Sequence, residues 1–240
     1  LDKNYIDKID FEVLQPAIDY YEDHGSATDK LRTYYYQGRI YQNAGDNEKA
    51  IQSWVKSLDL GNASNDLLTK ARNYNAQSLL YYKYFNWNKI IECSLRAASY
   101  FEELNDIDKY VFMLCRASEG YAHIGDKSSL NECFSKCDKY LSIISNRTKA
   151  HYYGVYLTHN RSSLTKENVY DVINKYLNIV PTEEVNWITL SNAYLSVGDI
   201  SSAKTSLNNY NKNNTDNTKY YAMLTQIYKE EGAYKNALRI

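Results

Sequence analysis

Apolar residues recur every three to four positions along most of the chain, the spacing that places them on one face of an α-helix. The pattern is clearest in residues 31–60, where one apolar stripe ends before Gly45-Asp46 and a second begins after it. Glycine readily adopts the left-handed conformation that ends a helix, and an aspartate that follows can cap the next helix. The stretch therefore predicts two helices joined by a short turn, each too narrow to bury its apolar face alone.

The same helix–turn–helix pattern recurs along the chain, and its first copies are about forty residues apart. Helical repeats of this kind stack, so that each pair covers an apolar face of its neighbour. Residues 1–30 are expected to be half a repeat that covers one end of the stack. The expected repeats that follow are residues 31–64, 71–104, 111–144, 147–180 and 184–217, and then a truncated repeat at 218–240.

Several segments depart from the regular pattern. The apolar residues of the N-terminal segment are Tyr5, Ile6, Ile9, Phe11 and Val13. A helix is expected to follow from Pro16 to about Asp23, because proline suits the first helical turn. Residues 160–163 predict a looser turn in the fourth repeat, and Thr182 is expected to cap the first helix of the fifth. The Asn-rich residues 208–218 predict the most mobile connection inside the chain.

The composition favours long helices with short connections. Of the 240 residues only two are proline, at Pro16 and Pro181, and nine are glycine. These two residue types are the strongest helix breakers. No window of the sequence combines alternating apolar and polar residues with the β-branched enrichment of a sheet. The sequence therefore predicts an all-α fold.

The stretch at residues 31–60 resembles a tetratricopeptide repeat, whose pattern is W-x₂-L-G-x₂-Y followed by A-x₃-F. The residues at the matching positions are Tyr34, Gln37, Gly38, Tyr41, Ala50 and Trp54. This resemblance implies a right-handed α–α superhelix, a solenoid of antiparallel helix pairs, as a single domain over residues 1–240. The long repeats are also similar to the sensor arrays of bacterial tetratricopeptide regulators, some cytoplasmic and some anchored in the envelope. A sensor or docking part of a longer bacterial regulatory protein is the function that this resemblance implies.

In tetratricopeptide arrays the first helices of successive repeats line a concave groove that holds a peptide or a segment of a partner protein. The resemblance therefore implies a groove lined by residues one position past the packing aromatics. Arg39 and Lys83 would favour an acidic group of the partner near one end. The alternative is that these residues only face solvent. The implied lining is Tyr35, Arg39, Gln42, Asn75, Leu79, Tyr82, Lys83, Cys115, Glu119, His123, His151, Val155, His159, Ile188 and Asn192.

Charge and motifs narrow the classes of function. The 28 basic and 29 acidic residues give a net charge of −1, whereas a general nucleic-acid surface is normally basic. No apolar run is long enough to span a bilayer, and no signal peptide opens the chain. A Gly-rich phosphate loop, H-E-x-x-H, G-x-S-x-G and paired Cys-x-x-Cys are all missing from the sequence. We therefore expect no enzyme, no cofactor, no metal and no nucleic-acid partner.

The histidines and cysteines leave alternatives open. His123, His151 and His159 could all face the groove, as hydrogen-bonded groove residues or as a metal- or pH-sensing cluster. The four cysteines are expected to be reduced thiols of the core, which fits a reducing compartment. They are Cys93, Cys115, Cys133 and Cys137. The alternative function to a peptide-binding module is a self-associating scaffold, in which the truncated last repeat forms a homodimer.

Overall fold

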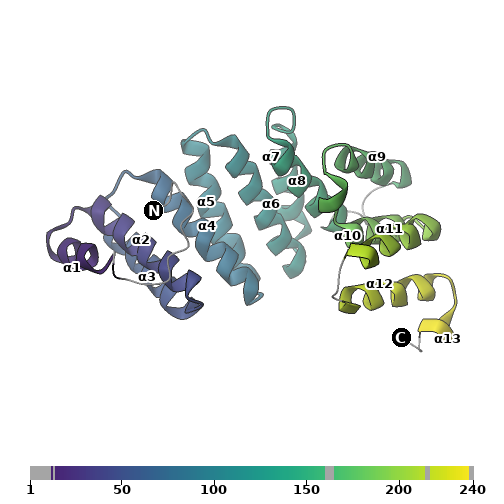
Figure 1. Ribbon diagram of the computed structural model, residues 1–240. Coiled ribbons are helices and arrows are strands. Elements are labelled where there is room, and N and C mark those ends of the chain that lie inside the picture. The colour runs from purple at the N-terminus through teal and green to yellow at the C-terminus, as the bar shows by residue number, and fades with distance from the viewer. Residues whose placement is uncertain (1–11, 13, 160–164, 214–216, 238–240) are drawn as a thin grey trace. The chain divides into compact units, whose positions relative to one another are not determined.

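A computed structural model describes residue 12 and residues 14–159, 165–213 and 217–237. Within these ranges the regular elements are thirteen α-helices and one short 3₁₀ helix, without a strand, so the predicted all-α class is confirmed (Figure 1). Helices that follow one another in the chain pack against each other. Residues 1–11, residue 13 and the turn at 160–163 lie outside the described residues. The predictions for Tyr5, Ile6, Ile9, Phe11, Val13 and that turn fall there.

The chain divides into two compact units, residues 1–133 and residues 134–240. The helices of the first unit are α1 (Gln15–His24), α2 (Ala27–Asn43), α3 (Asn47–Leu60), α4 (Leu67–Lys83), α5 (Trp87–Glu103) and α6 (Ile107–Ile124). The boundary falls inside α7 (Lys127–Asp138). The second unit contains α8 (Asn146–His159), α9 (Lys166–Leu177), the 3₁₀ helix Thr182–Glu184, α10 (Trp187–Ser196), α11 (Ile200–Asn213), α12 (Asn217–Glu230) and α13 (Tyr234–Ala237).

The forty-residue period of the sequence is visible in where the helices begin. The helices α2, α4 and α6 begin at residues 27, 67 and 107, and α3, α5 and α7 begin at 47, 87 and 127. Each of these starts follows a side chain that accepts a hydrogen bond from the backbone N–H three residues on, the usual cap of a helix N-terminus. The capping residues are Ser26, Asp46, Asp66, Asn86, Asp106 and Asp126. The observed first helices begin four residues before the predicted repeats, because the repeat pattern marks packing positions rather than caps.

Ring and polar contacts show how the pairs of the first unit are arranged. Tyr74 near the start of α4 stacks on Tyr100 near the end of α5, with ring centroids 6.1 Å apart. Tyr82 at the end of α4 meets Trp87 at the start of α5, so the two helices are antiparallel. Arg32 near the start of α2 pairs with Asp66, the cap of α4, at 2.6 Å. The first helices of successive pairs therefore begin on the same side.

Trp54 of α3 is the centre of the contact between the first two pairs. Its side chain is fully buried, and its indole Nε1 donates a hydrogen bond to the backbone oxygen of Tyr35 at 3.2 Å. The ring lies directly on Gly38 of α2, where an added Cβ would be 2.3 Å from Nε1. From the next pair, the Asn73 amide donates to the backbone oxygen of Trp54 at 3.1 Å. Gly38 thus allows α2 to approach the indole, as its position in the repeat pattern predicts.

Left-handed residues follow the first helices α2, α4, α6, α10 and α12. Gly45, Gly125, Gly198 and Gly232 have φ angles between 73° and 82°, which confirms the turn predicted at Gly45-Asp46. Phe85 occupies the equivalent place after α4, with φ of 54°. A bulky residue rarely takes this conformation, because its Cβ crowds the following carbonyl.

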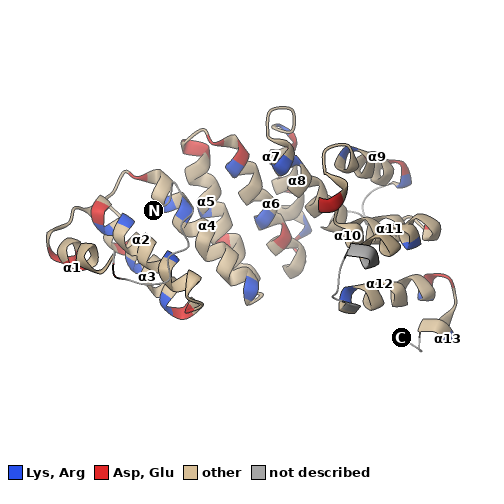
Figure 2. Ribbon diagram, in the orientation of Figure 1, with Lys and Arg blue, Asp and Glu red and all other residues tan. Residues whose placement is uncertain are grey.

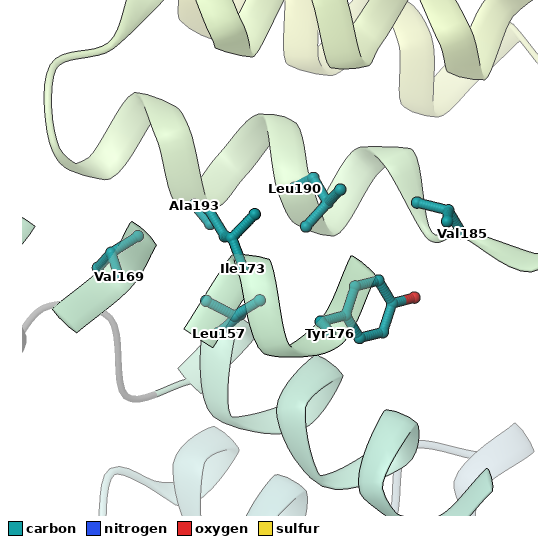
Figure 3. Close-up of a cluster of buried hydrophobic side chains, with 7 residues drawn as sticks. All are labelled: Leu157, Val169, Ile173, Tyr176, Val185, Leu190 and Ala193. Atoms are coloured by element: carbon teal, nitrogen blue, oxygen red, sulfur yellow. The ribbon is translucent and has the colours of Figure 1, made fainter. Parts of the chain in front are cut away.

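The core of the second unit joins three helices. Leu157 comes from α8, Ile173 from α9 and Leu190 from α10, and all three are fully buried. The backbone N–H of Asn186 donates to the Tyr176 hydroxyl at 3.0 Å, which ties the start of α10 to α9. Asn186, and not the predicted Thr182, caps α10 through its side chain. The cluster in Figure 3 consists of Leu157, Val169, Ile173, Tyr176, Val185, Leu190 and Ala193.

The segment 208–218, predicted as a connection between helices, is helical over most of its length. Helix α11 continues to Asn213, and α12 begins at Asn217. Two facts explain the difference. The segment 208–213 contains neither glycine nor proline, and the apolar stripe of α11, with Ala203 and Leu207, packs on Met223 and Ile227 of α12. Tertiary packing therefore outweighs the modest helix propensity of asparagine.

Gly38→Ala should destabilise the protein by about 2 kcal/mol, because the new methyl group must displace the buried Trp54 ring. Gly154→Ala is the matched control. Gly154 also lies inside a helix, but a Cβ there would meet nothing within 4 Å, so this change should stabilise by about 0.5–1 kcal/mol. Urea unfolding of the two variants measures both effects. Equal stability of both variants would contradict the proposed packing role of Gly38.

Candidate functional site

A polar cluster links the first helices of the second and third pairs. Arg116 of α6 donates from one guanidinium nitrogen to the side-chain oxygens of Asn75 and Ser78 on α4, each at 2.8 Å. The guanidinium carbon also lies 5.3 Å from the centre of the Phe112 ring. Burial lowers the pKa of Arg116. Since Arg116 is anchored on α4, the two helices present a common surface.

An aromatic cluster continues this surface toward the C-terminal ends of α4 and α6. Trp87 stacks on His123 with ring centroids 3.7 Å apart and planes inclined by 7°. Tyr82 meets the same indole edge to face at 5.7 Å, and Phe85 lies against it at 5.8 Å. The Phe85 side chain is 69% exposed and Tyr82 is 37% exposed. These rings form an aromatic surface that solvent reaches.

Glu119 lies between the two clusters, one helical turn from both Arg116 and His123 on α6. Its side chain is partly buried, and burial raises the pKa of its carboxyl group to about 7, against the opposing effect of Arg116. Among the described residues no donor forms a hydrogen bond with this carboxylate. Burial, and then the negative charge of Glu119, raise the pKa of Tyr82. His123, one turn after Glu119 on α6, stacks on Trp87, and Tyr82 contacts the same indole. Glu119 and Tyr82 therefore belong to one surface.

We call this surface the α4–α6 face. Leu79, one turn before Tyr82 on α4, belongs to it and is 46% exposed. Lys and Arg are interspersed with Asp and Glu over the first unit and do not gather on one helix, so the charge of a ligand would be recognised locally (Figure 2). The face consists of Asn75, Leu79, Tyr82, Phe85, Trp87, Arg116, Glu119 and His123, and the buried Ser78 hydroxyl holds Arg116 from below.

The structure brings several of the predicted groove residues together on this face, namely Asn75, Leu79, Tyr82, Glu119 and His123. Lys83 is exposed beside them at the end of α4. Sequence reasoning missed Arg116 and Trp87. Arg116 is equivalent to Ala76 of the preceding repeat, a position that does not directly follow a packing aromatic, so the rule for groove residues did not select it. Trp87 belongs to a second helix, and the rule covered only first helices.

Other predicted residues lie elsewhere in the first unit. Tyr35 is only 5% exposed and packs in the core with Trp54, and Cys115 is fully buried. Both therefore offer little surface to a ligand. Arg39 and Gln42 are partly buried on α2. They belong to the preceding pair, away from the Arg116 contacts.

The remaining predicted residues belong to the second unit. His151 and His159 are partly buried two turns apart on α8, and Val155 between them is buried. Asn192 of α10 donates its amide to the backbone oxygen of Ile188 at 3.2 Å. Asn192 also lines a pocket of about 360 Å³ between α10 and α12, together with Leu195, Ser196, Gln226, Lys229 and Glu230.

A metal site needs several ligand side chains close together, and a membrane span needs a long apolar helix. In the described part of the chain no group of three or more His, Cys, Asp and Glu side chains is arranged to hold a metal ion. None of the described helices combines the length and apolarity needed to cross a bilayer. All four cysteines are buried thiols, and burial raises the pKa of Cys93 to about 12. These thiols belong to the core, as predicted.

Comparison with known proteins gives no independent assignment. No model of a known protein family matches the chain, and no curated protein matches it. The α4–α6 face must therefore be interpreted from its own chemistry.

Glu119 should make the stability of the protein depend on pH. The folded state raises the pKa of its carboxyl group from 4.5 to about 7, so its stabilising contribution is complete below pH 4.5 and is lost as the pH rises through 7. Glu119→Gln removes the ionisation. At pH 8 this variant should be more stable than the wild type by roughly 1–3 kcal/mol, and the difference should shrink toward pH 4.5.

Urea unfolding between pH 4.5 and 8 measures this difference. Glu102→Gln is the control, since Glu102 is an exposed carboxylate on α5. This variant measures the effect of removing one exposed negative charge. A Glu119→Gln effect on stability that changes with pH no more than the effect of this control would show that Glu119 is not the perturbed group.

Proposed function

We propose that the chain is a non-catalytic binding module whose first helices hold an extended segment of a peptide or partner protein. The observation that carries this proposal is the α4–α6 face. There, the exposed rings of Tyr82 on α4 and Phe85 in the turn after it lie against Trp87 of α5. Helix α6 adds the carboxylate of Glu119, which has hydrogen-bonding capacity left. A face of this kind, on two helices held in register, suits a ligand that spans both.

The side chains of the face match what peptide recognition requires. Tyrosine and tryptophan offer large contact areas and lose little conformational entropy on binding. The side-chain oxygen of Asn75 already accepts a hydrogen bond from Arg116. The amide N–H groups of Asn75 are therefore the atoms that can bond to the backbone of a peptide. Arg116 in turn holds the face rigid, which lowers the entropy lost when a ligand binds.

We also propose that the helix pairs are tetratricopeptide-like repeats that coil as a right-handed solenoid. The forty-residue spacing of helix starts, the contact of Gly38 with Trp54 and the shared direction of successive first helices support this. A role as the sensor or docking part of a longer bacterial regulatory protein follows from the resemblance of the repeats to such arrays. The ligand of that part would be a protein or peptide.

Selection of a phage-displayed library of random dodecapeptides on the immobilised protein tests the proposal. Enriched peptides should bind the wild type, and Leu79→Glu should weaken them about tenfold, because a charge is placed in the middle of the contact. Val55→Glu is the matched control, since Val55 is 43% exposed on the second helix of the first pair. Its binding should match the wild type.

Two results would refute the proposed function. One is the absence of enriched peptides from a library that yields binders to a positive-control domain. The other is peptides whose binding is unaffected by Leu79→Glu. Circular dichroism of both variants checks that each remains helical.

A further inference from the structure

The carboxylate of Glu119 lacks the partners that a partly buried charge normally has. A buried carboxylate usually accepts two or more hydrogen bonds, since the loss of hydration must be compensated. No described residue donates to Glu119, and the nearby Arg116 does not overcome the effect of burial. A ligand that brings a donor and a positive charge would supply what this site lacks.

Arg116 is directed away from the aromatic end of the face. Its guanidinium binds Asn75 and Ser78, which precede Tyr82 by seven and four residues on α4. At 1.5 Å of helix rise per residue, these partners are about 10 Å and 6 Å from Tyr82 along the axis. The rings of Tyr82 and Phe85 therefore lie toward the end of the face farther from the α4 atoms that hold the guanidinium.

The aromatic rings at this end add a second reason for a cation. The faces of tyrosine and tryptophan attract ammonium and guanidinium groups, and they also pack against the methylene stems of Lys and Arg. Phe85 is held next to Trp87 in the left-handed conformation that the equivalent turns give to glycine. A large exposed ring kept in an unfavourable conformation is typical of a surface selected for binding.

We propose that Glu119, Tyr82, Phe85 and Trp87 bind a cationic side chain, arginine or lysine, of the segment that occupies the α4–α6 face. The proposal rests on the proposed function for the source of that side chain. The cation pairs with the Glu119 carboxylate, and its stem lies along the rings of Tyr82 and Phe85. An acidic side chain would instead face Glu119, while Arg116 is already bonded to two oxygens of α4.

Fluorine NMR of the whole chain labelled with 5-fluorotryptophan tests the site directly. The probes are N-acetyl-arginine methylamide, the lysine equivalent, the neutral norleucine equivalent and the acidic glutamate equivalent. Trp87 should respond to the two cationic probes, whereas the fully buried Trp54 serves as an internal reference. Which cation binds more tightly distinguishes guanidinium from ammonium recognition.

Glu119→Gln should weaken the cationic probes about tenfold, because a charge-assisted hydrogen bond is lost. Tyr82→Ala should weaken them about threefold through the lost ring. Glu102→Gln should leave binding unchanged. Equal response of Trp87 to norleucine, tighter binding of the glutamate probe, or no effect of Glu119→Gln would each overturn the proposal.

Phe85→Gly separates binding from stability. Glycine suits the left-handed conformation, so the variant should unfold at an equal or higher temperature than the wild type and yet bind the cationic probes more weakly. A variant that is stable and binds as the wild type does would remove Phe85 from the site.

The displayed peptides distinguish the two proposals. Suppose that the binding of the selected peptides requires Leu79 and yet does not involve any arginine or lysine that interacts with Glu119. In that case the cation site is wrong and the proposed function stands. If no peptide is selected but the arginine probe shifts Trp87 in a Glu119-dependent way, the cation site stands and the proposed function fails.

Discussion

Each helix of this protein buries its apolar face only against a neighbouring helix, and the contact of Trp54 with Gly38 shows how close that approach must be. The indole is fully buried on the glycine and donates a hydrogen bond to the backbone of α2, and the backbone oxygen of Trp54 accepts a hydrogen bond from Asn73 of α4. One residue thus helps to set the spacing of three helices. Because α4 is positioned in this way, its opposite side remains available to meet α6 and form the α4–α6 face.

Much of the fold could be predicted from the sequence because its signals are local. Apolar residues at helical spacing and glycines such as Gly45 and Gly125 determine helices and turns within a few residues. Where local signals were weak or competing, prediction failed. The Asn-rich end of α11 looked like a loop, but Leu207 holds it against α12. Thr182 precedes the start of α10 by several residues, and Asn186 is the side chain that reaches the free N–H.

The candidate site could be predicted only in part, since it depends on contacts between distant residues. Repeat positions pointed to Asn75, Tyr82, Glu119 and His123 because equivalent positions of successive first helices share a surface. Nothing in the sequence marks Arg116 as the partner of Asn75, which is 41 residues away. The burial of Tyr35 could not be predicted from the sequence either. Whether a residue next to a packing position faces the core or the solvent depends on the angle at which the neighbouring helix packs.

The regular caps of the first unit bear on how the chain reaches its folded state. Six consecutive helices begin after a side chain that satisfies a backbone N–H three residues away, so each start is encoded within its own turn. The tertiary bonds that join them, such as Arg32 to Asp66 and Arg116 to Asn75, close loops of only 34 and 41 residues. Short loops of this kind give a low contact order, which is characteristic of rapid folding. Assembly can therefore start at any helix pair of the unit and spread to its neighbours.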